Sequence, residues 1–464
     1  MKFIDRENEL KSLETKWREK SAHFFIIYGK RRVGKTELIK QFLNDKDGVY
    51  FLADKRNEKE QLRELGRLLG EKFNNEALRR DGFAQWIDVF EFLKNNIRQR
   101  FILAIDEYPY LVEGNDAVSS IFQKGWDEYL KHTGVFLILS GSSMAMMEAE
   151  ALLYKSPLYG RRTGQLLIRP MQFKHAHQFF TKKSFAEFLE IYAVAGGTPA
   201  YLTELIPDLD LLENIKKRIF PPTEYLHNEI EFILKEELRE PKNYLAIIRA
   251  IAWGKRKLGE IVNDTGLEKN IVTKYLMILD RLQIIEREVP ITEKNPGKSR
   301  KGLYQICDNF VRFWFQYIYP FKSDLEIGRY DVVLRKHKES FQVLVAIAYE
   351  QVCRQLLSDI LSNLRFEKIG KWWDKNEEID IVAINDETKE ILFGECKWSE
   401  KPVGTNIYDD LKRKAELVDW QTDKRKEYFI LFSKSGFTDE MKKIAKAAGN
   451  IFLVKQDKLE SYSG

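Results

Sequence analysis

The stretch Gly29-Lys30-Arg31-Arg32-Val33-Gly34-Lys35-Thr36 decides the fold of the first part of the chain. An apolar run, residues 24–28, precedes it, and a helical pattern begins at its last residue. A strand, a glycine-rich loop and a helix in this order form a phosphate loop, whose backbone N–H groups turn inward around phosphates. Lys35 is expected to reach the β- and γ-phosphates, and the Thr36 hydroxyl to hold Mg²⁺. The whole stretch therefore predicts a binding site for ATP or GTP.

A second apolar run, residues 101–105, ends in an acidic pair, Asp106 and Glu107. Such a pair at the carboxyl end of a buried strand is typical of the Walker B motif. We expect Asp106 to hold Mg²⁺ through its water shell and Glu107 to polarise the water that attacks the γ-phosphate. The pair predicts ATP hydrolysis as well as ATP binding.

Two further groups are candidates for the nucleotide site. Ser140 follows a third apolar run, residues 135–139, and we interpret it as a sensor of the γ-phosphate at the edge of a parallel sheet. Serine after a strand is also ordinary loop chemistry, so that alternative stays open. Arg161 or Arg162 is expected to neutralise charge at the γ-phosphate, within one chain or across a subunit contact. An exposed basic turn that makes surface ion pairs is the alternative.

Composition limits the class of protein. The chain has 464 residues, of which 32% are charged, and a formal net charge of +5. That length suggests roughly three domains, and the mild basicity identifies no partner by itself. Cys307, Cys353 and Cys396 lie far apart, which argues against structural zinc and a disulfide framework and favours a reducing cytoplasm. No apolar run approaches the ~18 residues needed to cross a bilayer, so we expect no membrane partner.

The order of patterns along the chain predicts an α/β multidomain protein. Strand-like and helical stretches alternate from residue 1 to about 205, which indicates a P-loop core with a parallel sheet. We expect a helical lid or linker at 206–240 and a helix-turn-helix at 241–320. The latter ends in an aromatic stretch that we interpret as a buried packing helix. Residues 321–464 are expected to form a further α/β domain.

Residues 241–306 have the pattern of a winged helix: short helices, a strand, a basic loop and a second strand. We expect its last helix to enter a major groove of DNA and its wing to hold phosphates. Winged helices also serve as packing modules beside ATPase cores, and that role stays open. The candidate contacts to DNA are Lys269, Asn270, Thr273, Lys274, Lys298, Arg300 and Lys301.

Two strand patterns near the carboxyl end carry Asp380, Glu395 and Lys397 in a D…ExK arrangement. On adjacent strands Asp380 and Glu395 are expected to converge on one Mg²⁺, and Lys397 faces the same side because strand side chains alternate. Lys397 is then placed to orient or help deprotonate an attacking water. Glu350, on the preceding amphipathic helix, is a candidate third carboxylate. Charged residues at strand ends are common, so a hairpin without catalysis is the alternative.

With these motifs, the chain resembles the prokaryotic, chiefly archaeal, AAA-type ATPases of the STAND-like group that carry a PD-(D/E)xK-like domain. The resemblance covers nearly the full length, and it implies an ATPase core with a helical lid, a winged helix and a restriction-endonuclease-like terminus. The usual Pro-Asp start of the nuclease motif is Ile379-Asp380 here. The segments that carry the resemblance include YGKRRVGKT at 28–36, AIDEY at 104–108, LSGSS at 139–143, GGTPAYL at 196–202 and FGECKW at 393–398.

Together these patterns predict a cytoplasmic, Mg²⁺-dependent ATPase that couples its nucleotide state to DNA binding and DNA cleavage. The alternative is a STAND-like regulatory switch, in which the winged helix and the last domain are binding modules that do not cut. We also expect copies of the chain to assemble through the ATPase core.

Overall fold

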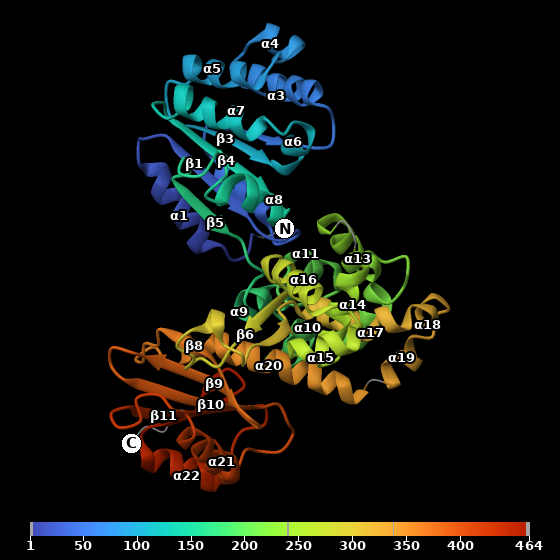
Figure 1. The fold of residues 1–464 in the computed structure, drawn as a ribbon, viewed down its shortest axis with the longest axis vertical. Coiled ribbons are helices and arrows are strands. Elements are labelled where there is room, and N and C mark those ends of the chain that lie inside the picture. The colour runs from blue at the N-terminus through green and yellow to red at the C-terminus, as the bar shows by residue number, and fades with distance from the viewer. Residues whose placement is uncertain (1–2, 239–240, 337, 461–464) are drawn as a thin grey trace. The chain divides into compact units, whose positions relative to one another are not determined.

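The computed structural model describes residues 3–238, 241–336 and 338–460. The chain forms two compact units, Met1–Met171 and Gln172–Gly464 (Figure 1). Residues 172–205, which the sequence places with the ATPase core, lie in the second unit. The reason is that the helix at 185–195 is apolar on nearly every side and is covered by helices from later in the chain.

The first unit is built on a five-stranded parallel sheet with the order β2-β3-β4-β1-β5. This confirms the predicted parallel α/β core. β3 and β4 are buried along their whole length, as expected for strands covered on both faces. The strands are β1 (His23–Tyr28), β2 (Gly48–Leu52), β3 (Phe101–Asp106), β4 (Val135–Gly141) and β5 (Gly164–Leu167).

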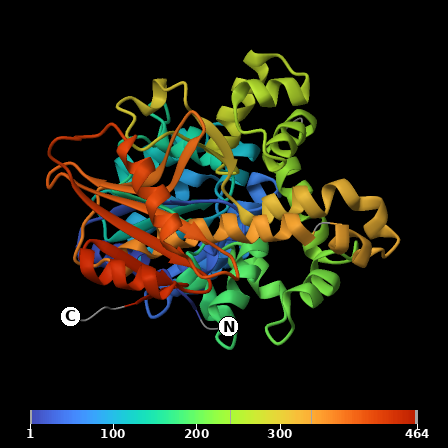
Figure 2. The same cartoon turned by 90° about the horizontal axis from the view of Figure 1, so that it is seen from below.

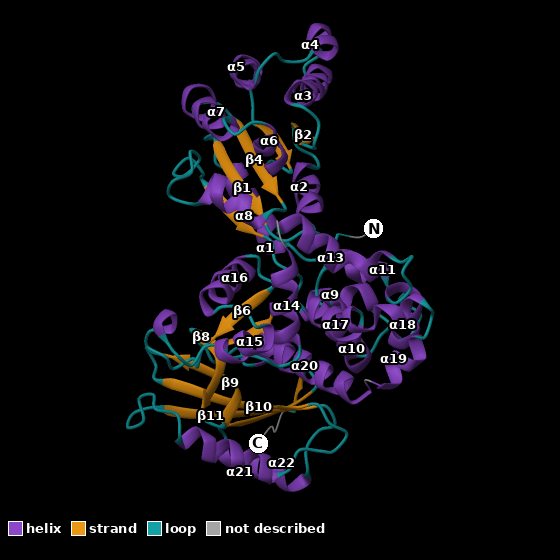
Figure 3. Cartoon of the chain, turned by 45° about the vertical axis from the view of Figure 1, so that its right-hand side comes forward, coloured by secondary structure: helices purple, strands orange, loops and turns teal. Residues whose placement is uncertain are grey.

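Helices cover both faces of this sheet (Figure 3). Leu13 of α1 and Phe42 of α2 pack on one face, and Leu65 of α3 and Phe90 of α5 pack on the other. The two faces arise because neighbouring strand residues point to opposite sides. The helices are α1 (Glu7–Arg18), α2 (Lys35–Leu43), α3 (Glu58–Lys72), α4 (Glu76–Asp81), α5 (Trp86–Asn96), α6 (Pro109–Gly114), α7 (Val118–Gly125), α8 (Met144–Met147) and the π-helical η1 (Trp126–Leu130) and η2 (Glu148–Leu152).

The second unit begins with helices and one antiparallel hairpin, β6 (Ile285–Glu288) with β7 (Leu303–Ile306). α17 (Asn309–Tyr317) is buried, as the aromatic stretch predicts, and its Trp314 Nε1 donates to the carbonyl of His227 at 2.7 Å. The other helices here are α9 (Phe173–Ala176), η3 (His177–Phe180), α10 (Phe185–Ala195), α11 (Pro199–Glu204), α12 (Leu211–Asn214), η4 (Ile215–Ile219), α13 (Tyr225–Glu237), α14 (Pro241–Ala252), α15 (Leu258–Thr265), α16 (Lys269–Arg281), η5 (Pro296–Lys298), η6 (Tyr319–Phe321), α18 (Lys322–Glu326) and α19 (Tyr330–Lys336).

A six-stranded mixed sheet, in the order β13-β12-β11-β10-β9-β8, completes the second unit. α20 (Lys338–Ile360) lies on one face of it, and α21 (Thr405–Glu416) and α22 (Asp439–Ala448) lie on the other (Figure 2; Figure 3). This sheet confirms a separate carboxyl-terminal α/β domain. Its strands are β8 (Lys368–Asp374), β9 (Glu377–Asn385), β10 (Glu390–Lys397), β11 (Lys426–Ser433), β12 (Ile451–Lys455) and β13 (Lys458–Leu459).

Within the described ranges, no helix is both long and apolar enough to span a bilayer.

Candidate nucleotide and metal sites

The phosphate loop lies between β1 and α2, as the sequence predicts. A Cβ atom at Gly29 would lie 2.2 Å from the carbonyl oxygen of Ile168, so only glycine fits there. Gly34 precedes α2 with φ of 92°, a conformation that glycine adopts without strain. Lys35 is 6% exposed, and its Nζ donates to the carbonyls of Gly29 at 2.9 Å and Lys30 at 2.8 Å. The loop therefore surrounds the ammonium of Lys35, which is the group expected to contact a phosphate.

The acidic residue of the second motif lies beside this loop. Thr36 Oγ1 donates to Asp106 Oδ2 at 2.6 Å, which brings together the two predicted Mg²⁺ residues. The Tyr50 hydroxyl on β2 donates to the same oxygen at 2.9 Å, and the backbone N–H of Glu107 donates to Oδ1 at 3.1 Å. Asp106 is only 1% exposed. These three donors hold the carboxylate of Asp106 in one orientation.

Glu107 contacts a serine other than Ser140, the predicted sensor. Glu107 has φ of 55°, and its Oε2 accepts from the Ser142 N–H at 3.2 Å and the Ser142 hydroxyl at 2.9 Å. The buried Ser140 hydroxyl has no hydrogen-bond partner among the described residues. The serine that contacts Glu107 is thus Ser142, and the role of Ser140 as a sensor of the γ-phosphate stays a prediction.

The two predicted arginines contact their own chain. Arg161 Nη2 lies 3.2 Å from Asp127 Oδ2, and Arg162 Nη1 donates to the Ala151 carbonyl at 3.0 Å. A different arginine supports the phosphate loop: Arg6 Nη2 donates to the carbonyl of Val33 at 3.0 Å. No local sequence pattern predicts this contact, because it joins segments far apart in the chain.

These residues fit a nucleoside triphosphate with Mg²⁺. The fit rests on a glycine whose Cβ would collide, a cation held inside the loop, and a buried carboxylate paired with the hydroxyl that follows the lysine. Lys30, Arg31 and Arg32 complete the loop, with Arg32 at φ of 70°.

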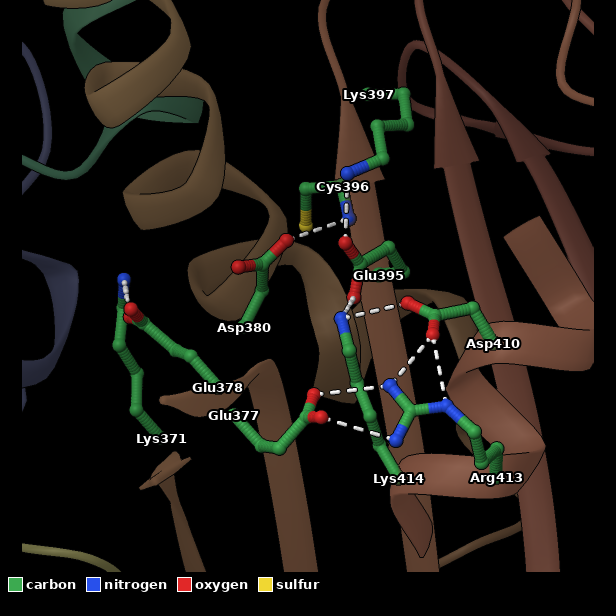
Figure 4. Close-up of polar contacts among 10 residues, drawn as sticks. All are labelled: Lys371, Glu377, Glu378, Asp380, Glu395, Cys396, Lys397, Asp410, Arg413 and Lys414. Carbon is green, nitrogen blue, oxygen red and sulfur yellow. Dashed lines mark hydrogen bonds and ion pairs between the residues drawn. The ribbon is translucent and has the colours of Figure 1, made fainter. Parts of the chain in front are cut away.

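The carboxyl-terminal candidate site lies on β9 and β10 (Figure 4). The backbone N–H of Cys396 donates to Asp380 Oδ2 at 2.9 Å, which joins the two strands at this point. Lys397 Nζ lies 2.6 Å from Glu395 Oε1, so the two residues share one face as predicted. Glu395 Oε2 is buried without a hydrogen-bond partner among the described residues, and Lys414 Nζ is 3.9 Å away.

The electrostatics of this site are those of crowded buried carboxylates. Burial raises the pKa of Asp380 to about 7, and the charges of Glu350 and Glu395 add to the rise. Burial lowers the pKa of Lys397, but Glu395 beside it has the larger combined effect and leaves that pKa above its ordinary value. A carboxylate oxygen without a hydrogen-bond partner, beside a second buried carboxyl group, fits a hard divalent cation such as Mg²⁺.

A buried lysine pairs with the third candidate carboxylate of this site. Lys371 is 7% exposed, and its Nζ hydrogen-bonds to Glu350 Oε2 and lies 3.2 Å from Glu378 Oε1. Among the described residues, the carboxylate oxygens of Glu350, Asp380 and Glu395 do not all lie within 4.8 Å of one another. The sequence did not single out Lys371 or Lys414, because lysines on a strand and a helix carry no motif.

A salt-bridge network fixes the helix that carries Lys414 (Figure 4). The Arg413 guanidinium forms a bidentate pair with Glu377 at 2.9 and 3.0 Å, and also contacts Asp410 at 2.7 Å. Lys414 Nζ lies 2.9 Å from Asp410 Oδ2. These contacts place α21 over the first residues of β9.

Most of the predicted DNA contacts lie on the surface of the second unit. Lys269, Asn270 and Lys274 are exposed on α16, and the Thr273 hydroxyl donates to the Lys269 carbonyl at 2.8 Å. The loop between β6 and β7 exposes Lys298 and Arg300.

Lys301, in the same loop, pairs with Asp374 Oδ1 of β8 at 2.9 Å, and its carbonyl accepts from Trp373 Nε1 at 3.1 Å. Lys301 is therefore engaged with the carboxyl-terminal sheet.

Comparisons with known proteins agree with this geometry. Residues 3–205 match a family model described as an ATPase domain predominantly from Archaea. Residues 314–413 match a model described as archaeal and bacterial proteins of unknown function. The first part of the chain is thus a P-loop ATPase domain that binds and hydrolyses ATP.

Three proteins that resemble this chain come from archaea. Uncharacterized protein MJECL04 of Methanocaldococcus jannaschii is 39% identical over 93% of this chain and 95% of its own length. The Walker-type ATPase paby2304 of Pyrococcus abyssi is 24% identical, with a TM-score of 0.48 over 68% of this chain and 96% of that one. The ORC2 protein of Aeropyrum pernix is 11% identical, with a TM-score of 0.44 over 73% of this chain and 96% of that one.

Proposed function

The chain belongs to the family of uncharacterized protein MJECL04, and on that premise we propose that its ATPase domain controls a DNA-facing second unit. Lys35 binds the phosphates, Thr36 and Asp106 hold Mg²⁺, and Glu107 orients the attacking water. The cation supplies charge neutralisation at the phosphates when bound. The observation that carries this step is the Thr36–Asp106 hydrogen bond of 2.6 Å, since it joins both motifs at one point.

We propose further that α14, α15, α16 and the β6–β7 hairpin form a winged helix that binds DNA. Three helices followed by an antiparallel hairpin support this proposal. Exposed Lys269, Asn270 and Lys274 on α16 are suited to the edges of bases and to phosphates in a major groove. Exposed Lys298 and Arg300 on the hairpin loop are suited to the backbone.

The third element of the proposal is cleavage of that DNA at Asp380, Glu395 and Lys397. Support comes from the orphaned Oε2 of Glu395 and from the Cys396 N–H that fixes Asp380 across the strand pair. The two carboxylates hold Mg²⁺, which supplies Lewis-acid activation of a phosphodiester. Lys397 orients the attacking water through its ammonium, which lies beside Glu395; the raised pKa of Lys397 makes it a proton donor and not the base.

A regulatory switch without cleavage is the second candidate. The pairing of Glu350 with Lys371 favours it, because a carboxylate that is already paired with a lysine is less suited to bind Mg²⁺. In that case the ATP and ADP states change the assembly of the chain, and the second unit only binds. Slow turnover with tightly retained ADP is the expected signature.

The test of the ATPase step uses three proteins: wild type, Lys35→Ala and Glu107→Gln. Wild type binds a fluorescent ATP analogue and releases phosphate. Lys35→Ala does not bind, because it removes the cation inside the loop, and Glu107→Gln binds but does not hydrolyse. Equal affinity of wild type and Lys35→Ala for the analogue would refute the site.

A further inference from the structure

Tyr50 contacts the predicted magnesium site although it belongs to neither nucleotide motif. It lies in the middle of β2, paired in register with Ala104 of β3. Its ring packs on the face of the sheet that α2 covers, and Lys40 of α2 lies 5.6 Å from the ring centre. From this position its hydroxyl reaches Asp106 Oδ2 at 2.9 Å.

Two hydroxyls share that one oxygen, but they differ in what else they can do. Thr36 is the last residue of the phosphate loop. The lone pairs of its hydroxyl oxygen can therefore face a cation while its hydrogen stays on Asp106. The Tyr50 hydroxyl comes from a strand on the other side of the carboxylate. The phenolic O–H of a tyrosine is a hydrogen-bond donor at neutral pH, and here it donates to Asp106 Oδ2.

We propose that Tyr50 is a positioning residue for Asp106, whose hydroxyl holds the carboxylate in the orientation that receives Mg²⁺ with ATP. This inference rests on the proposed ATPase function. Tyr50 adds a third strand, β2, to the magnesium site, because the two nucleotide motifs lie on the loop after β1 and at the end of β3. Asp106 is 1% exposed, so a carboxylate that lost its orientation would have no solvent to replace the missing donor.

We expect removal of the Tyr50 hydroxyl to lower the affinity for ATP only when Mg²⁺ is present. A hydrogen bond to a charged group contributes enough that its removal should weaken Mg²⁺-dependent ATP binding about tenfold. Binding of ATP without the cation should stay unchanged, because the phosphates are expected to meet Lys35, whose Nζ donates to the carbonyls of Gly29 and Lys30, whereas the Tyr50 hydroxyl lies at the proposed Mg²⁺ residues Thr36 and Asp106.

The experiment is calorimetric titration of ATP into the full chain, once with Mg²⁺ and once with EDTA. It compares wild type, Tyr50→Phe and a matched control, Tyr129→Phe. Tyr129 is a half-buried tyrosine of the same unit whose ring lies 5.3 Å from Lys94, and no hydrogen bond to its hydroxyl occurs among the described residues. Thermal unfolding of each variant verifies that all three are folded.

Three outcomes are distinct. Loss of affinity in Tyr50→Phe only when Mg²⁺ is present supports the inference, provided that Tyr129→Phe behaves as wild type. Equal affinities in wild type and Tyr50→Phe, or an equal loss with Mg²⁺ and with EDTA, overturn it. Absence of ATP binding by the wild type overturns the proposed function, and this inference with it.

Discussion

Glu107 Oε2 accepts two hydrogen bonds from a single residue, Ser142, through its N–H at 3.2 Å and its hydroxyl at 2.9 Å. Glu107 has a left-handed backbone, with φ of 55°, which a non-glycine residue adopts only when its surroundings hold it there. Ser142 therefore holds the Glu107 carboxylate in its orientation.

The first prediction concerns this serine. Ser142→Ala should lower the rate of ATP hydrolysis about tenfold, because a hydrogen bond to a charged group is lost, while ATP affinity stays unchanged. The measurement is phosphate release at saturating ATP, with affinity from an analogue titration. Ser140→Ala is the matched control, since its buried hydroxyl has no partner among the described residues. A larger loss of hydrolysis rate in Ser140→Ala than in Ser142→Ala would contradict this prediction and support Ser140 as the sensor.

The second prediction separates the basic residues of the hairpin loop. Lys298→Ala combined with Arg300→Ala should lower the slope of log affinity for DNA against log salt by about two, since each phosphate contact contributes roughly one. Lys301→Ala should change the slope less, because Asp374 already holds that ammonium at 2.9 Å. Fluorescence anisotropy with labelled duplex DNA over a salt series gives both slopes. An unaltered slope in the double variant assigns the loop to packing.

The third prediction uses the raised pKa of Asp380. This pKa is about 7 in the folded chain and about 3.9 in an unfolded chain, so the folded state binds the proton more tightly. Ionisation of Asp380 therefore destabilises the fold as the pH rises through that interval. Asp380→Asn, measured with EDTA, should unfold at a higher temperature than wild type at about pH 8, and the difference should shrink towards pH 5.

Calorimetric scans at several pH values measure this difference. Asp386→Asn is the control, because Asp386 is an exposed carboxylate at the end of the same hairpin strand. If Asp380→Asn is no more stable than wild type at about pH 8, that result contradicts the raised pKa of Asp380.

Much of the nucleotide site could be predicted because its residues lie in contiguous motifs. Lys35, Thr36 and Asp106 follow from strand, loop and helix patterns, and the structure brings them together. Tyr50 and Ser142 could not be predicted, because which side chains meet at a sheet edge depends on strand order and register. The contact of Arg6 with the phosphate loop could not be predicted for the same reason.

The carboxyl-terminal site shows the same limit. Period-two alternation places Glu395 and Lys397 on one face, and the structure agrees. The pairing of Glu350 with Lys371 depends on how α20 packs on the sheet, which no local pattern encodes. Likewise, the engagement of Lys301 with Asp374 could not be predicted from a charge run.

The central claim, an ATPase coupled to DNA cleavage, is tested most directly by a time course of labelled single- and double-stranded DNA with Mg²⁺, with and without ATP. It compares wild type, Lys397→Ala and Lys426→Ala; Lys426 is an exposed lysine at the start of β11. We expect wild type and Lys426→Ala to cut at a rate that changes with ATP, and Lys397→Ala to hydrolyse ATP without cutting. ATP hydrolysis by all three proteins with no cleavage by any of them would contradict the claim and leave a regulatory ATPase.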